Sequence, residues 1–312
     1  MIRIGVVNID VSHPSAFAEE LLKEDRARYV AVFNDGFRGE DQVKGFAEKF
    51  GLEKICDSVE ELADYVDVGF IQGCNWDRHL EYAMPFIERN KPVFIDKPMV
   101  GNMAECRKLI ELEKNGAVIL GSSALRYCNE VKDFLNPEPG KEGGLLHADI
   151  VVGIDEFNYA IHGVEAICAL AQEKPVSVKY LGVSEKGGQK CETYFVKFDG
   201  GATACYHSLA GRNVFMNIIV VGEKRCYSVK VDNGALYKAL LDELCDKLEG
   251  KENNVADMVT LTDSIKVMLA GKCSKENGGK EIALDAPELE ETSFDGYAFE
   301  EDYASKAKPM FV

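Results

Sequence analysis

The first 120 residues alternate between short apolar runs and amphipathic segments. The apolar runs are nearly continuous Val, Ile and Phe, which is typical of strands buried on both faces, and the segments between them repeat apolar residues at helical spacing. The predicted strands are 2–7, 29–33, 68–71, 92–95 and 118–120, and the predicted helices are 15–23, 42–50, 59–65, 79–88 and 103–115. This order predicts a doubly wound, Rossmann-like parallel sheet with helices on both faces.

The pattern changes after about residue 127, where strand patterns follow one another across Gly-rich hairpin turns. The predicted strands are 145–154, 177–184, 191–198, 202–208, 214–222 and 225–231, and the predicted helices are 159–171, 236–248 and 255–269. Such a run predicts an α+β domain whose mostly antiparallel sheet is open on one face. We therefore expect two domains, residues 1–124 and 125–312. The acidic tail 287–306 has little apolar periodicity, and we expect it to wrap the surface or serve an oligomer contact.

Composition narrows the possible partners and the compartment. The formal net charge of −17 disfavours nucleic acid and anionic membranes as partners, because both require a basic surface. Ten cysteines are scattered without a Cys-x-x-Cys pair or a matching histidine spacing, so we expect no metal site and a reducing, cytoplasmic location. The sequence has neither a signal-peptide pattern nor an apolar run of membrane-spanning length.

Candidate chemistry appears first where the strand predicted over 92–95 ends in Asp96-Lys97-Pro98. Ligands of open α/β sheets bind outside the carboxyl ends of the strands, so Lys97 would project into that crevice. Partial desolvation lowers the pKa of a lysine, which suits acid–base work near neutral pH. A surface lysine at a strand end is an equally good interpretation of the tripeptide by itself.

The first crossover is the place for a dinucleotide, because a helix amino end offers free N–H groups to pyrophosphate. The expected Gly-x-Gly-x-x-Gly is missing. Ser12 could cap the helix, and Asp10 puts a negative charge where a phosphate would sit. A capped turn that binds no phosphate is therefore an open alternative. The turn reads Asn8-Ile9-Asp10-Val11-Ser12-His13-Pro14.

Two further segments border the predicted crevice. Asp35 ends the second strand, the place for an acid that binds a ribose 2′-hydroxyl and so favours NAD over NADP, although Asn-Asp-Gly is also an ordinary turn. Asn75, Trp76 and His79 follow the strand 68–71. We expect them beside the cofactor, while capping and packing roles explain Trp76 and His79 equally well.

The helix predicted over 159–171 carries the second candidate acid–base group. Asn158 and His162 are four residues apart and would share one helix face, with Glu165 one turn further. An imidazole on this face could relay a proton to or from a hydroxyl group. The alternative is a hydrogen-bonded histidine packed at a helix start.

Together these pieces resemble the Gfo/Idh/MocA oxidoreductase family, which includes glucose–fructose oxidoreductase and inositol 2-dehydrogenase. The resemblance covers nearly the whole chain. It rests on His79, on Asp96-Lys97-Pro98 in place of the family's Glu-Lys-Pro, and on the later helix that carries His162.

This resemblance implies NAD or NADP in the first domain and a sugar, polyol or related hydroxy compound against the open sheet of the second. Residues 122–127 look like the family's interdomain strand with its Arg-aromatic pair. Lys97 matches the catalytic lysine and His162 the catalytic histidine. Asn158 stands where many members carry an aspartate, and Glu165 replaces another common aspartate. The implied reaction is hydride transfer between nicotinamide and a carbinol carbon, with His162 exchanging the hydroxyl proton and Lys97 stabilising the oxygen.

We therefore predict an NAD-dependent dehydrogenase or reductase, with NADP less favoured, that assembles as a homodimer or homotetramer through the open sheet. An NAD-assisted glycosidase or lyase, and a binding protein that has lost the cofactor, are the alternatives. The predicted catalytic residues are Lys97, His162 and Asn158. The predicted cofactor-binding residues are Asn8, Asp10, Ser12, His13, Asp35, Asn75, Trp76, His79, Asp96 and Lys97.

Overall fold

A six-stranded parallel sheet forms the first half of the chain in the computed structural model, which describes residues 1–214 and 216–308. The strand order is β3-β2-β1-β4-β5-β6, so the direction of winding reverses between β1 and β4. The strands are β1 (Ile2–Val7), β2 (Ala27–Phe33), β3 (Lys54–Ile55), β4 (Val68–Ile71), β5 (Val93–Ile95) and β6 (Ile119–Leu120). The helices are α1 (His13–Leu21), α2 (Glu40–Phe50), α3 (Val59–Tyr65), α4 (His79–Glu88) and α5 (Met103–Lys114), with short 3₁₀ turns η1 (Trp76–Arg78) and η2 (Ala124–Tyr127). The predicted doubly wound sheet is confirmed.

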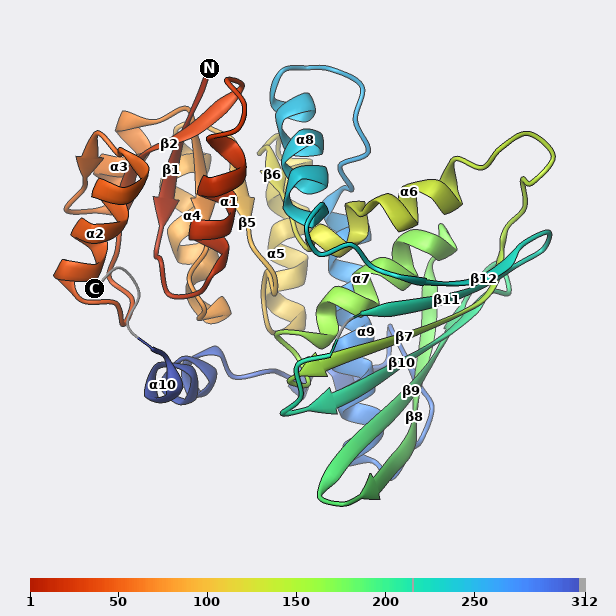
Figure 1. The fold of residues 1–312 in the computed structure, drawn as a ribbon. Coiled ribbons are helices and arrows are strands. Elements are labelled where there is room, and N and C mark those ends of the chain that lie inside the picture. Colours follow the sequence, from red (N-terminus) through yellow and green to blue (C-terminus); the bar gives the residue numbers. More distant parts are fainter. Residues whose placement is uncertain (215, 309–312) are drawn as a thin grey trace.

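The second half forms a seven-stranded sheet of order β12-β11-β7-β10-β9-β8-β13. Strands β7 and β10 pair in parallel, and the other neighbouring strands pair antiparallel. Helices α7 and α9 cover one face, and the opposite face is open (Figure 1), as predicted. The strands are β7 (Leu145–Ile154), β8 (Pro175–Lys186), β9 (Gln189–Phe198), β10 (Thr203–Ala210), β11 (Asn217–Gly222), β12 (Cys226–Lys230) and β13 (Ile282–Ala283). The helices are α6 (Asn129–Leu135), α7 (Ala160–Ala171), α8 (Leu236–Leu248), α9 (Met258–Glu276) and α10 (Gly296–Lys306), with the 3₁₀ turn η3 (Pro287–Glu291).

Most predicted elements differ from the structure only at their ends, but four helices and strands are new. Strands β3 and β13 and helices α6 and α10 follow patterns too short or too weakly periodic to predict. Helix α10 instead depends on tertiary contacts and on its cap, where Asp295 accepts a hydrogen bond from Ala298 N. Helix α9 begins at Met258 and continues to Glu276, beyond the predicted segment. The predicted strand 214–222 includes position 215, which lies outside the described residues, and β11 begins at Asn217.

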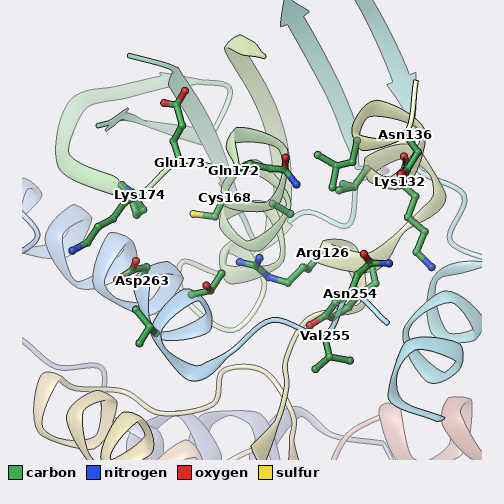
Figure 2. A pocket seen from close by; sticks show the side chains of 17 residues that line it. Arg126, Lys132, Asn136, Cys168, Gln172, Glu173, Lys174, Asn254, Val255 and Asp263 are labelled. Carbon is green, nitrogen blue, oxygen red and sulfur yellow. Dashed lines mark hydrogen bonds between the residues drawn. The ribbon is translucent and has the colours of Figure 1, made fainter. Parts of the chain in front are cut away.

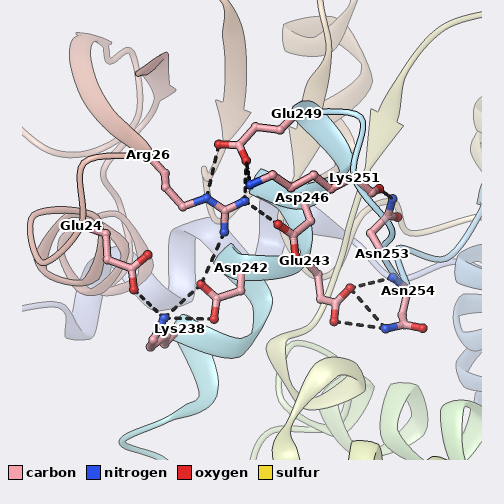
Figure 3. Close-up of polar contacts among 10 residues, drawn as sticks. All are labelled: Glu24, Arg26, Lys238, Asp242, Glu243, Asp246, Glu249, Lys251, Asn253 and Asn254. Carbon is pink, nitrogen blue, oxygen red and sulfur yellow. Dashed lines mark hydrogen bonds and ion pairs between the residues drawn. The ribbon is translucent and has the colours of Figure 1, made fainter.

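Helix α8 returns from the second sheet and packs against α1 of the first. Around this contact Arg26 binds Asp246 at 2.5 Å and Glu249 at 2.8 Å, and Lys238 binds Glu24 at 2.6 Å (Figure 3). These groups are partly exposed, so each pair contributes little to stability. The core packing of α8 through apolar side chains therefore does more than the ion pairs to join the two halves. Helices within the described residues are all too short or too polar to cross a membrane.

Candidate active site

Lys97 lies just beyond the carboxyl end of β5, at the junction of the two halves. Its side chain is only 8% exposed, and Nζ donates hydrogen bonds to Oδ1 of Asn158 at 2.7 Å and to the carbonyl oxygen of the same residue at 3.2 Å. Burial lowers the pKa of Lys97, although the carboxylates of Asp96 and Asp155 oppose this change. The structure thus presents a buried amine that can donate a hydrogen bond and share its proton.

Asp96 uses its carboxylate to hold the start of α1. Its Oδ2 lies 2.7 Å from Nδ1 of His13, and its Oδ1 accepts a hydrogen bond from Lys97 N at 2.7 Å. Burial alone would raise the pKa of Asp96, but His13 and Lys97 hold it below its usual range. The ring of His13 consequently lies beside that of His162, with 6.2 Å between centroids. His13, predicted to bind cofactor, therefore lies beside the predicted catalytic residue His162, and Asp96 supports it from behind.

His162 lies in the first turn of α7 and is 8% exposed. Its Nδ1 is 2.7 Å from the hydroxyl oxygen of Ser123. Burial, together with Lys97 and His13, holds the pKa of His162 well below its usual range, so the imidazole is neutral at physiological pH. Where Nδ1–H donates to Ser123, Nε2 carries the lone pair and can accept a proton.

Asn158 connects Lys97 to a carboxylate that sequence reasoning missed. Its Nδ2 donates to Oδ2 of Asp155 at 3.2 Å, and Asp155 also accepts from the N–H groups of Phe157 and Tyr159. Burial raises the pKa of Asp155, although these hydrogen bonds oppose the change. Asp155 follows Ile154, whose φ of 75° is unusual for a β-branched residue. An acid at the end of a long strand was the available sequence signal.

A cavity of about 220 Å³ opens beside His13 and His162, while Lys97 and Asn158 are not among the described residues that line it. Both halves of the chain line it, and its size suits a small molecule. Its polar lining residues are His13, Tyr159, His162, Asn213, Asn233 and Tyr237.

A larger cavity, of about 620 Å³, lies between α6, the end of α7 and the start of α9 (Figure 2). Two of its cations are already used: Arg126 pairs with buried Glu165 and donates to Ser264 at 3.3 Å, and Lys132 binds Glu243 at 2.8 Å. The residues that line this cavity include neither Lys97 nor a histidine. Glu165 thus holds η2 against α7, away from the catalytic candidates.

The turn between β1 and α1 packs against the loops that follow β2 and β4. Asn8 has a positive φ of 65°, and its Oδ1 accepts from the N–H groups of Asp35 and Gly36 at 2.9 and 3.2 Å. Ser12 occupies the N-cap position, but within the described residues its side chain makes no capping hydrogen bond, contrary to the expectation that it would cap the helix. Asp10 is 1% exposed, and burial raises its pKa to about 6. Because this buried carboxylate lies against Gly36 and Cys74 beside the start of α1, the present arrangement does not fit a pyrophosphate group.

Asp35 lies at the end of β2, as predicted for a ribose-binding acid. Its carboxylate already accepts hydrogen bonds from Arg78, at 2.7 Å, and from Tyr82. Burial would raise the pKa of Asp35, but these two hydrogen bonds hold it below its usual range. The Asp35 carboxylate is therefore ionised, and it already accepts hydrogen bonds from side chains of the same chain.

Asn75, Trp76 and His79 fix loops rather than line the 220 Å³ cavity. The ring nitrogens of His79 lie 3.0 and 2.9 Å from the carbonyl oxygens of Met99 and Gly73. Nε1 of Trp76 donates to the carbonyl oxygen of Phe294 at 2.9 Å. For both Trp76 and His79, the contacts in the structure are those of residues that hold loops in place, which is the alternative to a role in cofactor binding.

Helix α10 lies across the edge at which β1 and its neighbours end (Figure 1). Glu300 accepts a hydrogen bond from Asn75 Nδ2 at 3.0 Å, and the ring of Phe299 lies 4.9 Å from that of Trp76. Just past the helix, Lys308 O accepts from Arg38 at 2.7 Å. The tail thus covers the predicted cofactor-binding residues of this edge.

Comparison with known proteins adds family information for the first half. Residues 2–123 match the Gfo/Idh/MocA profile, described as "Oxidoreductase family, NAD-binding Rossmann fold". A myo-inositol 2-dehydrogenase of Thermotoga maritima is 30% identical over 119 residues, 38% of this chain and 34% of the relative. An inositol 2-dehydrogenase of Gluconacetobacter diazotrophicus is 37% identical over 60 residues, 19% of this chain and 18% of the relative. The matched segments span about a third or less of those relatives.

Solved structures resemble the whole fold at low sequence identity. A probable dehydrogenase from Thermotoga maritima has a TM-score of 0.76 and 20% identity, and the match covers 91% of this chain and 99% of that one. A myo-inositol dehydrogenase from Lactobacillus casei, in complex with NAD(H) and myo-inositol, has a TM-score of 0.75 and 11% identity, over 92% and 97% of the two chains. At these identities the likeness establishes the fold.

Proposed function

The chain belongs, through residues 2–123, to the Gfo/Idh/MocA oxidoreductase family, and from this we propose that it oxidises or reduces a CH–OH group of a sugar- or polyol-like substrate with NAD rather than NADP. The predicted family is confirmed. The predicted cofactor class is confirmed at the level of the family, whose first domain is described as NAD-binding. The substrate class and the preference for NAD are our proposals, and Asp35 supports the second, since an acid at this position favours a free ribose 2′-hydroxyl.

One observation carries the proposal: Lys97, whose Nζ binds Asn158, lies close enough to His162 to lower the pKa of its imidazole, and His162 lines the 220 Å³ cavity. A buried amine and a neutral imidazole side by side suit proton exchange with an alcohol and stabilisation of its oxygen. The family resemblance assigns these two roles to the same residues. The residues and their environments therefore support the same chemistry.

The proposed roles follow from the hydrogen bonds. Lys97 donates to the substrate oxygen and stabilises the negative charge that develops there, while Asn158 and Asp155 hold the amine in place. His162 accepts the hydroxyl proton, and Ser123 orients its ring. The family's nicotinamide cofactor would supply the hydride chemistry, while Lys97, Asn158 and His162 would hold the substrate oxygen and its proton. Because pyrophosphate does not fit the turn as it stands, we assign residues 8–12 no part in the reaction.

The second candidate function is a binding protein without cofactor. Two observations together favour it: the turn after β1 carries the buried Asp10, and the C-terminal tail covers this edge of the parallel sheet. The NAD-assisted glycosidase or lyase alternative predicts tightly retained NAD without net NADH production.

Calorimetric titration of nucleotide-stripped protein with NAD, NADH, NADP and NADPH tests these possibilities. We expect NAD(H) to bind more tightly than NADP(H), and the protein then to reduce NAD in a screen of polyols and sugars. Absence of both binding and retained nucleotide would reject the dehydrogenase and support the cofactor-free protein.

We further propose that copies of the chain associate through the open sheet face. The exposed fractions of Leu181, Val183 and Ile219 on these strands are 54%, 50% and 43%, and such apolar side chains favour association. Light scattering during size-exclusion chromatography would give a dimer or tetramer, and a monomer at high concentration would reject this. All ten cysteines are free, which favours the proposed cytoplasmic location.

A further inference from the structure

Three potential metal ligands meet beneath helix α10. They are the carboxylate of Asp10 in the β1–α1 turn, the thiol of Cys74 after β4, and the carboxylate of Glu300 in α10. Their ligand atoms all lie within 4.8 Å of one another. Asp10 and Cys74 are buried, and Glu300 is half-buried. The cluster thus lies outside the proposed catalytic crevice.

A second observation indicates that the cluster is incomplete. Oδ1 of Asp10 is buried without a hydrogen-bond partner in the described part of the chain, while Oδ2 accepts from Cys74 N at 3.3 Å and the Cys74 side chain also contacts the carboxylate. An unsatisfied buried carboxylate oxygen destabilises an apolar interior unless a proton or a cation compensates it. A cation beside Asp10 and Glu300 would supply that compensation.

Another group of comparable composition lacks this property. His147, Asp149 and Cys205 lie together, half-exposed, on the open face of the second sheet. There His147 and His207 each place a ring nitrogen 3.3 Å from Asp149, so the carboxylate has partners of its own. This group serves as a control for the cluster beneath α10.

We propose that Asp10, Cys74 and Glu300 bind a divalent metal ion of the zinc type. A thiolate ligand selects zinc over the hard cations magnesium and calcium. Tetrahedral zinc, with bonds of about 2.3 Å to sulfur and about 2.0 Å to oxygen, separates its ligand atoms by roughly 3.5 Å. The three ligands therefore need to approach one another by about 1 Å, and water would complete the coordination.

Metal binding would fasten α10 to the edge of the parallel sheet. Asn75 Nδ2, which donates to Glu300 at 3.0 Å, would orient the third ligand. Burial raises the pKa of the Cys74 thiol, so binding would release one proton from sulfur to the solvent. The site takes up the turn in which Asp10 was predicted to bind cofactor, so it does not rest on the proposed oxidoreductase activity and can be tested without it.

The test is titration of the reduced, metal-free full chain with Co²⁺ and with Zn²⁺, by absorption spectroscopy and calorimetry. We expect one ion per chain, with a sulfur-to-cobalt charge-transfer band that Zn²⁺ abolishes. Cys74→Ser should remove this band. Glu300→Gln lies on a partly exposed helix and should leave the fold intact. It should weaken metal binding more than tenfold, which exceeds the smallest loss that removal of a supporting hydrogen-bond partner causes.

Cys205→Ser and Cys226→Ser are the matched controls, since the first belongs to the other group and the second is an exposed cysteine. Both should keep the band and the affinity of the unmodified chain. Failure of the unmodified chain to bind one ion would overturn the proposal. So would a band that survives Cys74→Ser, or binding that Glu300→Gln leaves unchanged.

Discussion

The parallel sheet carries buried charge at two places along its carboxyl edge, around Lys97 after β5 and around Asp10 after β1. The two places differ in how the charged groups are hydrogen-bonded. At the first, Lys97 binds Asn158, Asp96 binds His13, and His162 binds Ser123. At the second, Asp10 is equally buried, yet one of its oxygens lacks a partner among the described residues. A set of mutually satisfied groups is preorganised for chemistry, whereas an unsatisfied carboxylate indicates a site that another group completes.

Lys97→Ala should have the largest effect on turnover, and it tests the hydrogen-bonded groups around Lys97. We expect turnover to fall by about 10²- to 10⁴-fold, because the oxygen loses its charged hydrogen-bond donor. Affinity for the dinucleotide should change little. Steady-state kinetics and calorimetry measure the two quantities, with Lys108→Ala, an exposed lysine of α5, as control. Near-normal turnover in Lys97→Ala would remove the lysine from the mechanism.

His162→Asn should cost roughly 10²-fold or more in turnover. Since the pKa of His162 is held well below its usual range, the unmodified enzyme should lose activity only as the pH falls through that lowered pKa and the ring gains a proton. The acid limb of the pH–rate profile should disappear in the variant. His147→Asn, on the open sheet face, should retain the limb; an unchanged profile in His162→Asn would contradict the assigned role.

Gly36→Ala tests the close packing around Asp10. A Cβ there would lie 2.2 Å from Oδ1 of Asp10, so we expect a destabilisation of about 1–3 kcal/mol in urea unfolding. Gly39→Ala is the control, because a Cβ at that position meets no described atom within 4 Å. In an Asp10→Ala background the cost of Gly36→Ala should largely vanish. Equal costs in both backgrounds would show that the carboxylate is not the obstacle.

Glu105→Gln should reveal a pH-dependent contribution to the free energy of unfolding, from the region where the C-terminal tail packs against α5. Glu105 accepts from Gly101 N and Asn102 Nδ2, and burial raises its pKa from 4.5 to about 7. The fold therefore favours the protonated acid, and this contribution is present below pH 4.5 and lost as the pH rises through about 7. The full shift corresponds to roughly 3 kcal/mol, which solvent exposure reduces to about 1 kcal/mol.

The measurement is the free energy of unfolding of the unmodified chain and of Glu105→Gln at pH 5 and pH 8. The unmodified chain should lose stability relative to the variant over this range. Glu111→Gln, an exposed position on the same helix, should track the unmodified chain. A constant difference between Glu105→Gln and the unmodified chain would refute the raised pKa.

Arg26→Ala should have the smallest effect, because its ion pairs lie apart from the groups around Lys97 and around Asp10. We expect a loss of at most about 1 kcal/mol at low salt that shrinks at high salt, with turnover and Co²⁺ binding unchanged. Thermal unfolding at two ionic strengths checks this. A salt-independent loss would indicate that the guanidinium stem contributes by packing.

Local patterns were sufficient to predict the two sheets, because buried parallel strands and Gly-turn hairpins leave short-range signatures. Local patterns also placed Lys97 at a strand end and His162 at a helix start, but the roles predicted for them came from the family resemblance. Asp155 escaped prediction because its role depends on a positive φ at the residue before it. The cluster of Asp10, Cys74 and Glu300 could not be predicted, since its members come from three segments that only the docking of α10 unites.

That docking gives the protein an internal optical probe. Trp76 is the only tryptophan in the sequence, and it lies under the tail, bonded to Phe294 and packed against Phe299. Release of the tail would break the indole hydrogen bond and expose the ring to water. The intrinsic fluorescence of the unlabelled protein therefore reports whether the edge of the parallel sheet is covered, in any titration and without an added dye.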